Sequence, residues 1–110
     1  EARHFLVWRN RLEEMGSYYG ALPVHDGLWQ SATETRHSLL ARLAVVHMVH
    51  EAHGLDVVPK SRGRLVGAGD RKSADILVQI ERDEITHVAA GVKWFKYLCG
   101  HSKMSEQETI

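Results

Sequence analysis

Three Glu-x-x-His pairs occur along the chain, at Glu1/His4, Glu34/His37 and Glu84/His87. In a helix, such a pair places a carboxylate and an imidazole on adjacent turns of one face. Carboxylate oxygens and imidazole nitrogens are common ligands of iron, manganese and zinc in proteins. The pairs therefore predict a metal site, provided that their helices bury them and bring them together.

The pair Glu84/His87 interrupts an apolar stripe. Spacings of three and four residues put it on one helical face with Leu77, Ile80, Gly91, Trp94 and Leu98. An ionised carboxylate in an apolar core costs several kcal/mol unless something compensates its charge. A metal cation, a buried arginine or a hydrogen-bond network would each do so, and the stripe alone leaves these alternatives open.

Two other segments offer matching groups. Glu1 and His4 share a helical face with Phe5, Trp8, Leu12 and Met15. Glu51 lies on roughly the same side of its helix as Leu40, Leu43, Ala44 and His47. We therefore predict five metal ligands, which are Glu1, His4, Glu51, Glu84 and His87.

The pair Glu34/His37 is interpreted differently. It lacks apolar neighbours that would draw it into a core, and charged residues are mostly exposed. His37 and Glu51 are fourteen residues apart, which is about 21 Å along one helix at ~1.5 Å per residue. They cannot bind the same pair of metal ions, so we predict that Glu34 and His37 are solvated.

The apolar periodicity predicts an all-α fold with three main helices and no strands. Gly16 should end the first helix, Gly54 and Pro59 the second, and Ser73 should cap the start of the third. We expect the aromatic side chains Trp8, Trp94, Phe95 and Tyr97 in the core. The predicted boundaries are 1–15, 33–55 and 73–99 for the helices, 56–72 for a loop, 24–30 for a short helical turn, 1–100 for the domain and 101–110 for a polar, flexible tail.

Composition narrows the class of protein. The 110 residues carry a formal net charge of zero, which argues against a broad nucleic-acid or anionic-membrane surface. Cys99 is the single cysteine, so no intrachain disulfide can form, and a reducing, cytoplasmic location is expected. No run of residues approaches the ~18 apolar positions that a membrane span requires.

Two Glu-x-x-His helices and two single-Glu helices make up the di-iron or di-manganese site of a four-helix bundle. That arrangement needs six ligands, and the predicted helices supply five. No capping residue precedes Glu1, so we expect the chain to start within a helix and to lack the first helix of the bundle.

Four segments carry a family resemblance: EARHF, YGALPVHDGLW, HEAHGLDVVP and DEITHVAAGVKWF, spanning residues 1–5, 19–29, 50–59 and 83–95. They resemble the ferritin-like family catalogued as domain of unknown function 455. The resemblance implies a ferritin-like four-helix bundle with a di-iron centre held by the same five ligands. His53 replaces an arginine that is usual in the family, and the family's preceding helix is missing.

Our leading hypothesis is a non-haem protein with two metal ions, iron first and manganese second, that oxidises or hydroxylates a substrate with dioxygen. The substrate would be a small molecule or a group carried on tRNA, and no membrane is involved. The alternatives are a non-catalytic iron-binding or storage protein and a helical interaction module without metal. The missing helix also predicts a homodimer through an uncovered seam of the bundle.

Overall fold

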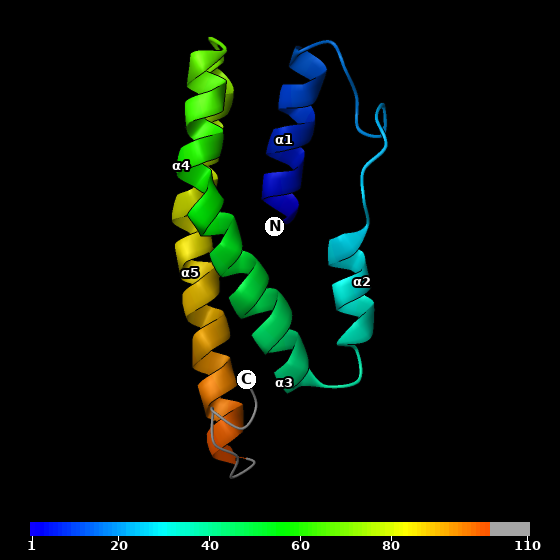
Figure 1. The fold of residues 1–110 in the computed structure, drawn as a ribbon, viewed down its shortest axis with the longest axis vertical. Coiled ribbons are helices and arrows are strands. Elements are labelled where there is room, and N and C mark those ends of the chain that lie inside the picture. Colours follow the sequence, from blue (N-terminus) through cyan, green and yellow to red (C-terminus); the bar gives the residue numbers. More distant parts are fainter. Residues whose placement is uncertain (102–110) are drawn as a thin grey trace.

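Helices form all of the regular secondary structure in residues 1–101, the part of the chain that the computed structural model describes. The all-α class is therefore confirmed for these residues, which contain no strand. A continuous helix in the middle of the chain has three parts, called α3, η1 and α4 (Figure 1). The bounds are α1 Ala2–Glu14, α2 Gly27–Glu34, α3 Leu39–Arg42, η1 Leu43–His50, α4 Glu51–Gly67 and α5 Arg71–His101.

The two long helices set the shape of the molecule. α4 and α5 run antiparallel side by side, and α3–η1 diverges obliquely from them while still contacting α5 (Figure 1). α1 also packs on α5, and α2 packs on η1 at the end of an extended connection (Figure 1). The result is an elongated molecule of 52 × 24 × 20 Å.

The apolar core lies between α3–η1 and the C-terminal half of α5. It contains the buried side chains of Leu43, Phe95 and Cys99, with Leu40, Ala44, Met48 and Leu98 packed against them. Phe95 was predicted correctly, whereas Trp94 and Tyr97 are 51% and 52% exposed and the prediction for them was wrong. Each precedes a core-facing residue by one position, which turns its side chain by about 100° away from the buried side chains of the core.

The middle helix differs from its predicted span of 33–55 at both ends. Residues Thr35 to Ser38 separate α2 from α3, and the Ser38 hydroxyl caps α3 by accepting a hydrogen bond from the Ala41 amide. At the other end α4 continues to Gly67, so the predicted loop over 56–72 was wrong. The short helical turn expected at 24–30 is the first part of α2.

Packing explains why Gly54 and Pro59 do not end the helix. Leu55, Val58 and Leu65 recur on one side of α4, and all three are buried or half-buried. A proline inside a helix costs about 3 kcal/mol. Burial of several aliphatic side chains, at about 1.5–3 kcal/mol each, offsets that cost. Local propensity was therefore a poor guide to this helix, because the contacts of α4 with α5 dominate.

Glycines with positive φ end the helices where the chain does turn. Gly69 has a φ of +82°; its amide donates to the Val66 carbonyl, and the Asp70 amide donates to the Leu65 carbonyl. This is the Schellman arrangement, which satisfies the last carbonyls of α4. Gly16, with a φ of +85°, closes α1 in the same way and confirms that predicted stop.

Asp70, and not the predicted Ser73, caps the start of α5. Its carboxylate accepts hydrogen bonds from the Ser73 amide at 3.0 Å and from the Arg11 guanidinium at 2.8 Å. These bonds, with those to Ser73 first, lower the pKa of Asp70 to about 2. Arg11 also donates to the buried Ser73 hydroxyl, and this fixes the C-terminal end of α1 on α5.

α5 continues past Cys99, the predicted end of the third helix, to His101. The predicted tail thus loses its first residue to α5, and residues 102–110 lie outside the described part of the chain. None of the described helices is long and apolar enough to cross a lipid bilayer.

Candidate metal centre

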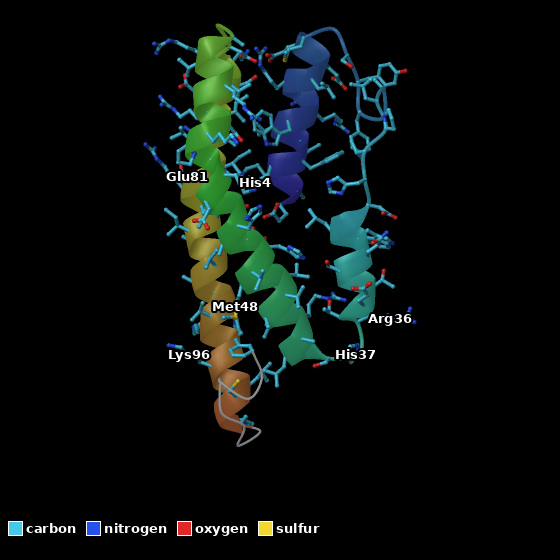
Figure 2. All side chains as sticks on the ribbon, viewed as in Figure 1. His4, Arg36, His37, Met48, Glu81 and Lys96 are labelled. Carbon is cyan, nitrogen blue, oxygen red and sulfur yellow. The ribbon has the colours of Figure 1, made fainter. Side chains whose placement is uncertain are left out.

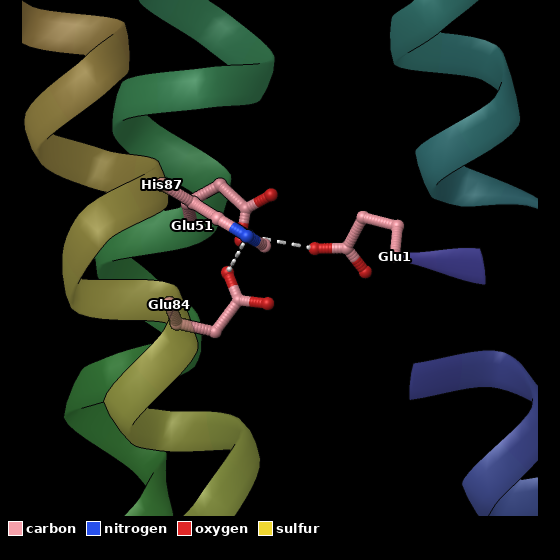
Figure 3. A group of neighbouring side chains, drawn as sticks. All are labelled: Glu1, Glu51, Glu84 and His87. Atoms are coloured by element: carbon pink, nitrogen blue, oxygen red, sulfur yellow. Dashed lines mark hydrogen bonds and ion pairs between the residues drawn. The ribbon is translucent and has the colours of Figure 1, made fainter. Parts of the chain in front are cut away.

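Four of the five predicted ligands converge on one point. Ligand atoms of Glu1, Glu51, Glu84 and His87 all lie within 4.8 Å of one another, so this group could hold a metal ion (Figure 3). Glu1 directly precedes α1, Glu51 is the first residue of α4, and Glu84 and His87 lie in the middle of α5. Three segments that are distant in sequence therefore meet here.

His87 lies between two of the carboxylates. Its Nδ1 atom is 3.1 Å from Oε1 of Glu1 and 3.4 Å from Oε2 of Glu84. The second distance is across one helical turn, as the Glu-x-x-His spacing requires. The nitrogen, whichever tautomer it adopts, therefore points into the group of carboxylates.

His4, the fifth predicted ligand, lies on the other side of Glu84. It is the one buried residue of α1, and its Nδ1 atom is 3.4 Å from Oε1 of Glu84. The rings of His4 and His87 are 5.7 Å apart. The two oxygens of Glu84 thus face two different imidazoles.

The centre has more negative charge than its protein partners neutralise. Oε2 of Glu84 and Nδ1 of His4 are buried and have no hydrogen-bond partner among the described residues. Burial, followed by the neighbouring carboxylates of Glu51 and Glu1, raises the pKa of Glu84 to about 9. Without a cation, Glu84 therefore keeps its proton at neutral pH.

The pKa of Glu1 is shifted in the opposite direction, below its ordinary value. Burial acts to raise its pKa, but the hydrogen bond with Glu84, together with the nearby His4 and His87, outweighs this and lowers the pKa. Its side chain is 65% exposed. The pair consequently shares one proton, held on the more buried Glu84.

Asp83 is a contributor that sequence reasoning missed. Its Oδ2 atom is 2.8 Å from Nε2 of His4 and also bonds to the Arg3 guanidinium. These contacts, with His4 first, lower the pKa of Asp83. The carboxylate favours the tautomer of His4 with a proton on Nε2, which leaves the Nδ1 lone pair directed at Glu84. The sequence feature that could have identified Asp83 is its position directly before Glu84, on the side of the helix that faces α1.

Close packing of α5 on η1 brings Glu51 to the centre. A Cβ atom added at Gly91 would lie 2.7 Å from the backbone carbonyl oxygen of His47, so only glycine allows this approach. The η1 segment is π-helical and ends directly before Glu51. π-helical turns are rare and are found frequently at functional sites.

The pair Glu34/His37 is exposed, as predicted. Glu34 is the last residue of α2, and His37 lies beyond it in the turn to α3, away from His4 and the candidate centre (Figure 2). The two residues are not even on one helix. The Glu-x-x-His motif thus occurs here without the geometry of a ligand pair.

Comparison with known proteins identifies relatives without an assigned activity. An uncharacterized protein of Haemophilus influenzae (strain ATCC 51907 / DSM 11121 / KW20 / Rd) is 38% identical over 98 residues, which cover 89% of this chain. The chain spans about a third, 34%, of that relative's length. No solved structure matches the chain. The family described as Protein of unknown function (DUF455) matches residues 1–109, and the chain belongs to this family.

Proposed function

We propose that this chain supplies most of the ligands of a two-metal carboxylate centre in a ferritin-like four-helix bundle. With its metals bound, the protein would be a di-iron oxidase or hydroxylase, and manganese is the second choice of metal. The proposed ligands are Glu1, His4, Glu51, Glu84 and His87. The observation that supports this proposal most strongly is the position of Glu84 between two imidazoles, with further carboxylates of Glu1 and Glu51 beside it.

The donor set fits such a centre. Carboxylates and imidazoles together suit iron and manganese, whereas a structural zinc site usually includes cysteine. Cys99, the single cysteine, is buried in the core with Leu43 and Phe95, apart from the carboxylate group. Oε2 of Glu84 and Nδ1 of His4 are buried without a hydrogen-bond partner among the described residues, and these are the atoms that metal ions would bind.

A metal ion would also replace the proton on Glu84. Three carboxylates and two neutral imidazoles can balance most of the charge of two divalent ions, and a sixth, carboxylate ligand would complete the balance. We propose that a further helix of the longer protein supplies this residue. The greater length of the curated relative leaves room for one.

Bound iron would supply sites for dioxygen and a route for its reduction. In a hydroxylation, one oxygen atom enters a C–H bond of the substrate, and the other leaves as water with two protons and two electrons from an external reductant. The residues of this chain would hold and orient the metals. Asp83 would position His4, and the half-buried Trp8 of α1 would contribute to an apolar surrounding that limits access of water.

The test uses the full-length protein loaded anaerobically with ferrous iron. We expect two iron ions per chain by elemental analysis and consumption of dioxygen on exposure to air. Glu84→Ala and His87→Ala should abolish both, whereas Glu34→Ala and His37→Ala serve as controls with the same motif and should change neither. Fewer than one metal ion per chain, or no effect of Glu84→Ala and His87→Ala, would overturn the proposal.

Two alternatives give different results in the same experiment. A storage or detoxification protein would bind iron and consume dioxygen without loss of an organic substrate. A metal-free interaction module would bind no iron at any pH. One observation favours the interaction module, because large exposed apolar groups often mark interfaces. The exposed apolar side chains are those of Tyr18, Leu22, Val24 and Trp29.

The homodimer expected from an uncovered bundle seam stays a prediction. We expect the isolated 110-residue chain to self-associate, because large apolar side chains are exposed on α1, α2 and α5. Light scattering after size-exclusion chromatography measures this directly. A monomer that unfolds cooperatively would contradict the expectation.

A further inference from the structure

A pocket of about 370 Å³ lies directly beside the candidate metal centre. Glu1, Glu51 and His87 form one part of its lining, so it shares three of the four converging residues. The remainder of the lining is Leu43, His47, Ala90, Gly91 and Trp94, from η1 and the next two turns of α5. A molecule in this pocket would lie against the metals that we propose.

The lining of the pocket is mostly apolar away from the carboxylates. Leu43 belongs to the core, Ala90 and Gly91 present little more than backbone, and the Trp94 ring is half exposed and forms a flat wall. The volume is near the lower end of the ~300–1,000 Å³ range of small-molecule sites. It suits a compound the size of one substituted ring.

Charge selects further among possible ligands. The residues that line the pocket include no lysine or arginine, and two of them are carboxylates. Lys93 places its ammonium group 5.6 Å from the centre of the Trp94 ring but does not line the pocket. In the metal-free protein, a phosphate or carboxylate group on a ligand would therefore lie near two carboxylates and find no lysine or arginine to pair with.

We propose that this pocket is the substrate site, and that it takes a small, uncharged, largely apolar molecule with a single ring. The proposal rests on the proposed function, since the metals would act on the bound molecule. It disfavours a substrate carried on tRNA, because the phosphates of tRNA would approach a lining without lysine or arginine.

The pocket can be tested without any turnover. Benzyl alcohol and phenyl phosphate are probes of one ring that differ in charge, and saturation-transfer NMR on the full-length protein reports their binding. Ala90→Phe should fill the pocket from an exposed position of α5 and weaken benzyl alcohol binding at least about tenfold. Ala89→Phe is the matched control, because Ala89 is equally an exposed residue of α5 but does not line the pocket.

A second pair of variants removes a wall of the pocket. Trp94→Ala should weaken benzyl alcohol binding, whereas Trp29→Ala, at an exposed tryptophan of α2 outside the lining, should not. Absence of benzyl alcohol binding, equal binding by Ala90→Phe and Ala89→Phe, or tighter binding of phenyl phosphate would each overturn the proposal. The last result would indicate a phosphate-bearing substrate.

The measurement separates the two proposals from each other. The NMR titration is made on both metal-free and iron-loaded protein, and bound iron is counted independently. If iron binds at two per chain and benzyl alcohol does not bind, the pocket proposal fails while the metal centre stands. If benzyl alcohol binds in the pocket and iron does not bind, the proposed function fails while binding in the pocket is still supported.

Discussion

The chain contains the same four-residue motif in two contrasting settings. Glu84 and His87 lie on consecutive turns of α5, where Glu1 and Glu51 from two other segments approach them. Glu34 ends α2, and His37 follows in an exposed turn with no carboxylate of another helix nearby among its described contacts. The difference between the pairs lies in burial and convergence, because their residue types and spacing are identical.

The comparison separates two requirements of a metal centre. Spacing within one helix brings two ligands together at little cost, and this is why the motif is common. The remaining ligands must come from elsewhere in the fold, and packing must hold their like charges close together. At the α5 pair this leaves Glu84 protonated and its buried Oε2 atom without a hydrogen bond among the described residues. At the Glu34 pair, solvent satisfies each group separately.

The largest expected effect contrasts the two pairs directly. Because Glu84 carries a proton at neutral pH in the folded protein but not in the unfolded chain, Glu84→Gln should stabilise the metal-free protein at pH 7 by about 1 kcal/mol. The same substitution replaces a carboxylate of the proposed metal centre and should weaken iron binding by at least about a hundredfold. Glu34→Gln should alter neither property. Competition against a colorimetric chelator measures the affinity, and equal affinities of the two variants would contradict the contrast.

The second effect is a dependence of stability on pH. In the unfolded chain Glu84 ionises near the ordinary glutamate pKa of 4.5, whereas in the folded chain its pKa is about 9. Folding stability from this group is therefore present at pH 4 and is lost as pH rises towards 9. The loss should be on the order of 2 kcal/mol, since water around the exposed Glu1 screens part of the repulsion.

Urea unfolding of metal-free protein at pH 5, 7 and 9 measures how the free energy of unfolding depends on pH. The quantity of interest is the difference between wild type and Glu84→Gln, because histidines titrate in the same range. Glu34→Gln should show the same dependence of unfolding free energy on pH as wild type. If wild type and Glu84→Gln show parallel pH profiles, the carboxylates are not held together in the folded protein.

A third effect concerns the packing that brings Glu51 to Glu84. Gly91→Ala places a Cβ atom 2.7 Å from the His47 carbonyl oxygen and should destabilise the protein by about 1–2 kcal/mol. Gly54→Ala, inside α4 with nothing within 4 Å of the new atom, should stabilise it by about 0.5–1 kcal/mol. Thermal unfolding of both variants checks the opposite signs. A stabilised Gly91→Ala would show that α5 and η1 are farther apart.

The smallest effect is that of the positioning residue. Asp83→Asn keeps the shape of the side chain but weakens the hydrogen bond that orients His4, and should reduce iron affinity about tenfold. Asp75→Asn, at an exposed position two turns earlier on α5, is the control and should have no effect. The NMR signals of the His4 ring should report a shifted tautomer balance in Asp83→Asn alone. An unchanged ring spectrum would exclude the positioning role.

The sequence predicts the positions of some site residues well and the bounds of some helices poorly. The Glu-x-x-His spacing and the apolar stripes are local properties, so the places of Glu84 and His87 on one helix face followed from sequence alone. The long α4 did not, because Gly54 and Pro59 are local signals that contacts with α5 outweigh. Asp83 was missed because its partner, His4, is 79 residues away in the sequence. The exposure of Trp94 depends on which helices are adjacent, and periodicity cannot specify that.

The central claim is that Glu84 bridges two metal ions between His4 and His87. Anomalous diffraction at the iron edge, from crystals of the full-length protein loaded with ferrous iron, tests it most directly. We expect two peaks about 3.5–4 Å apart, one beside His4 and one beside His87, with Glu84 between them. A single peak elsewhere, or none within reach of Glu84 in protein that otherwise binds iron, would contradict the account.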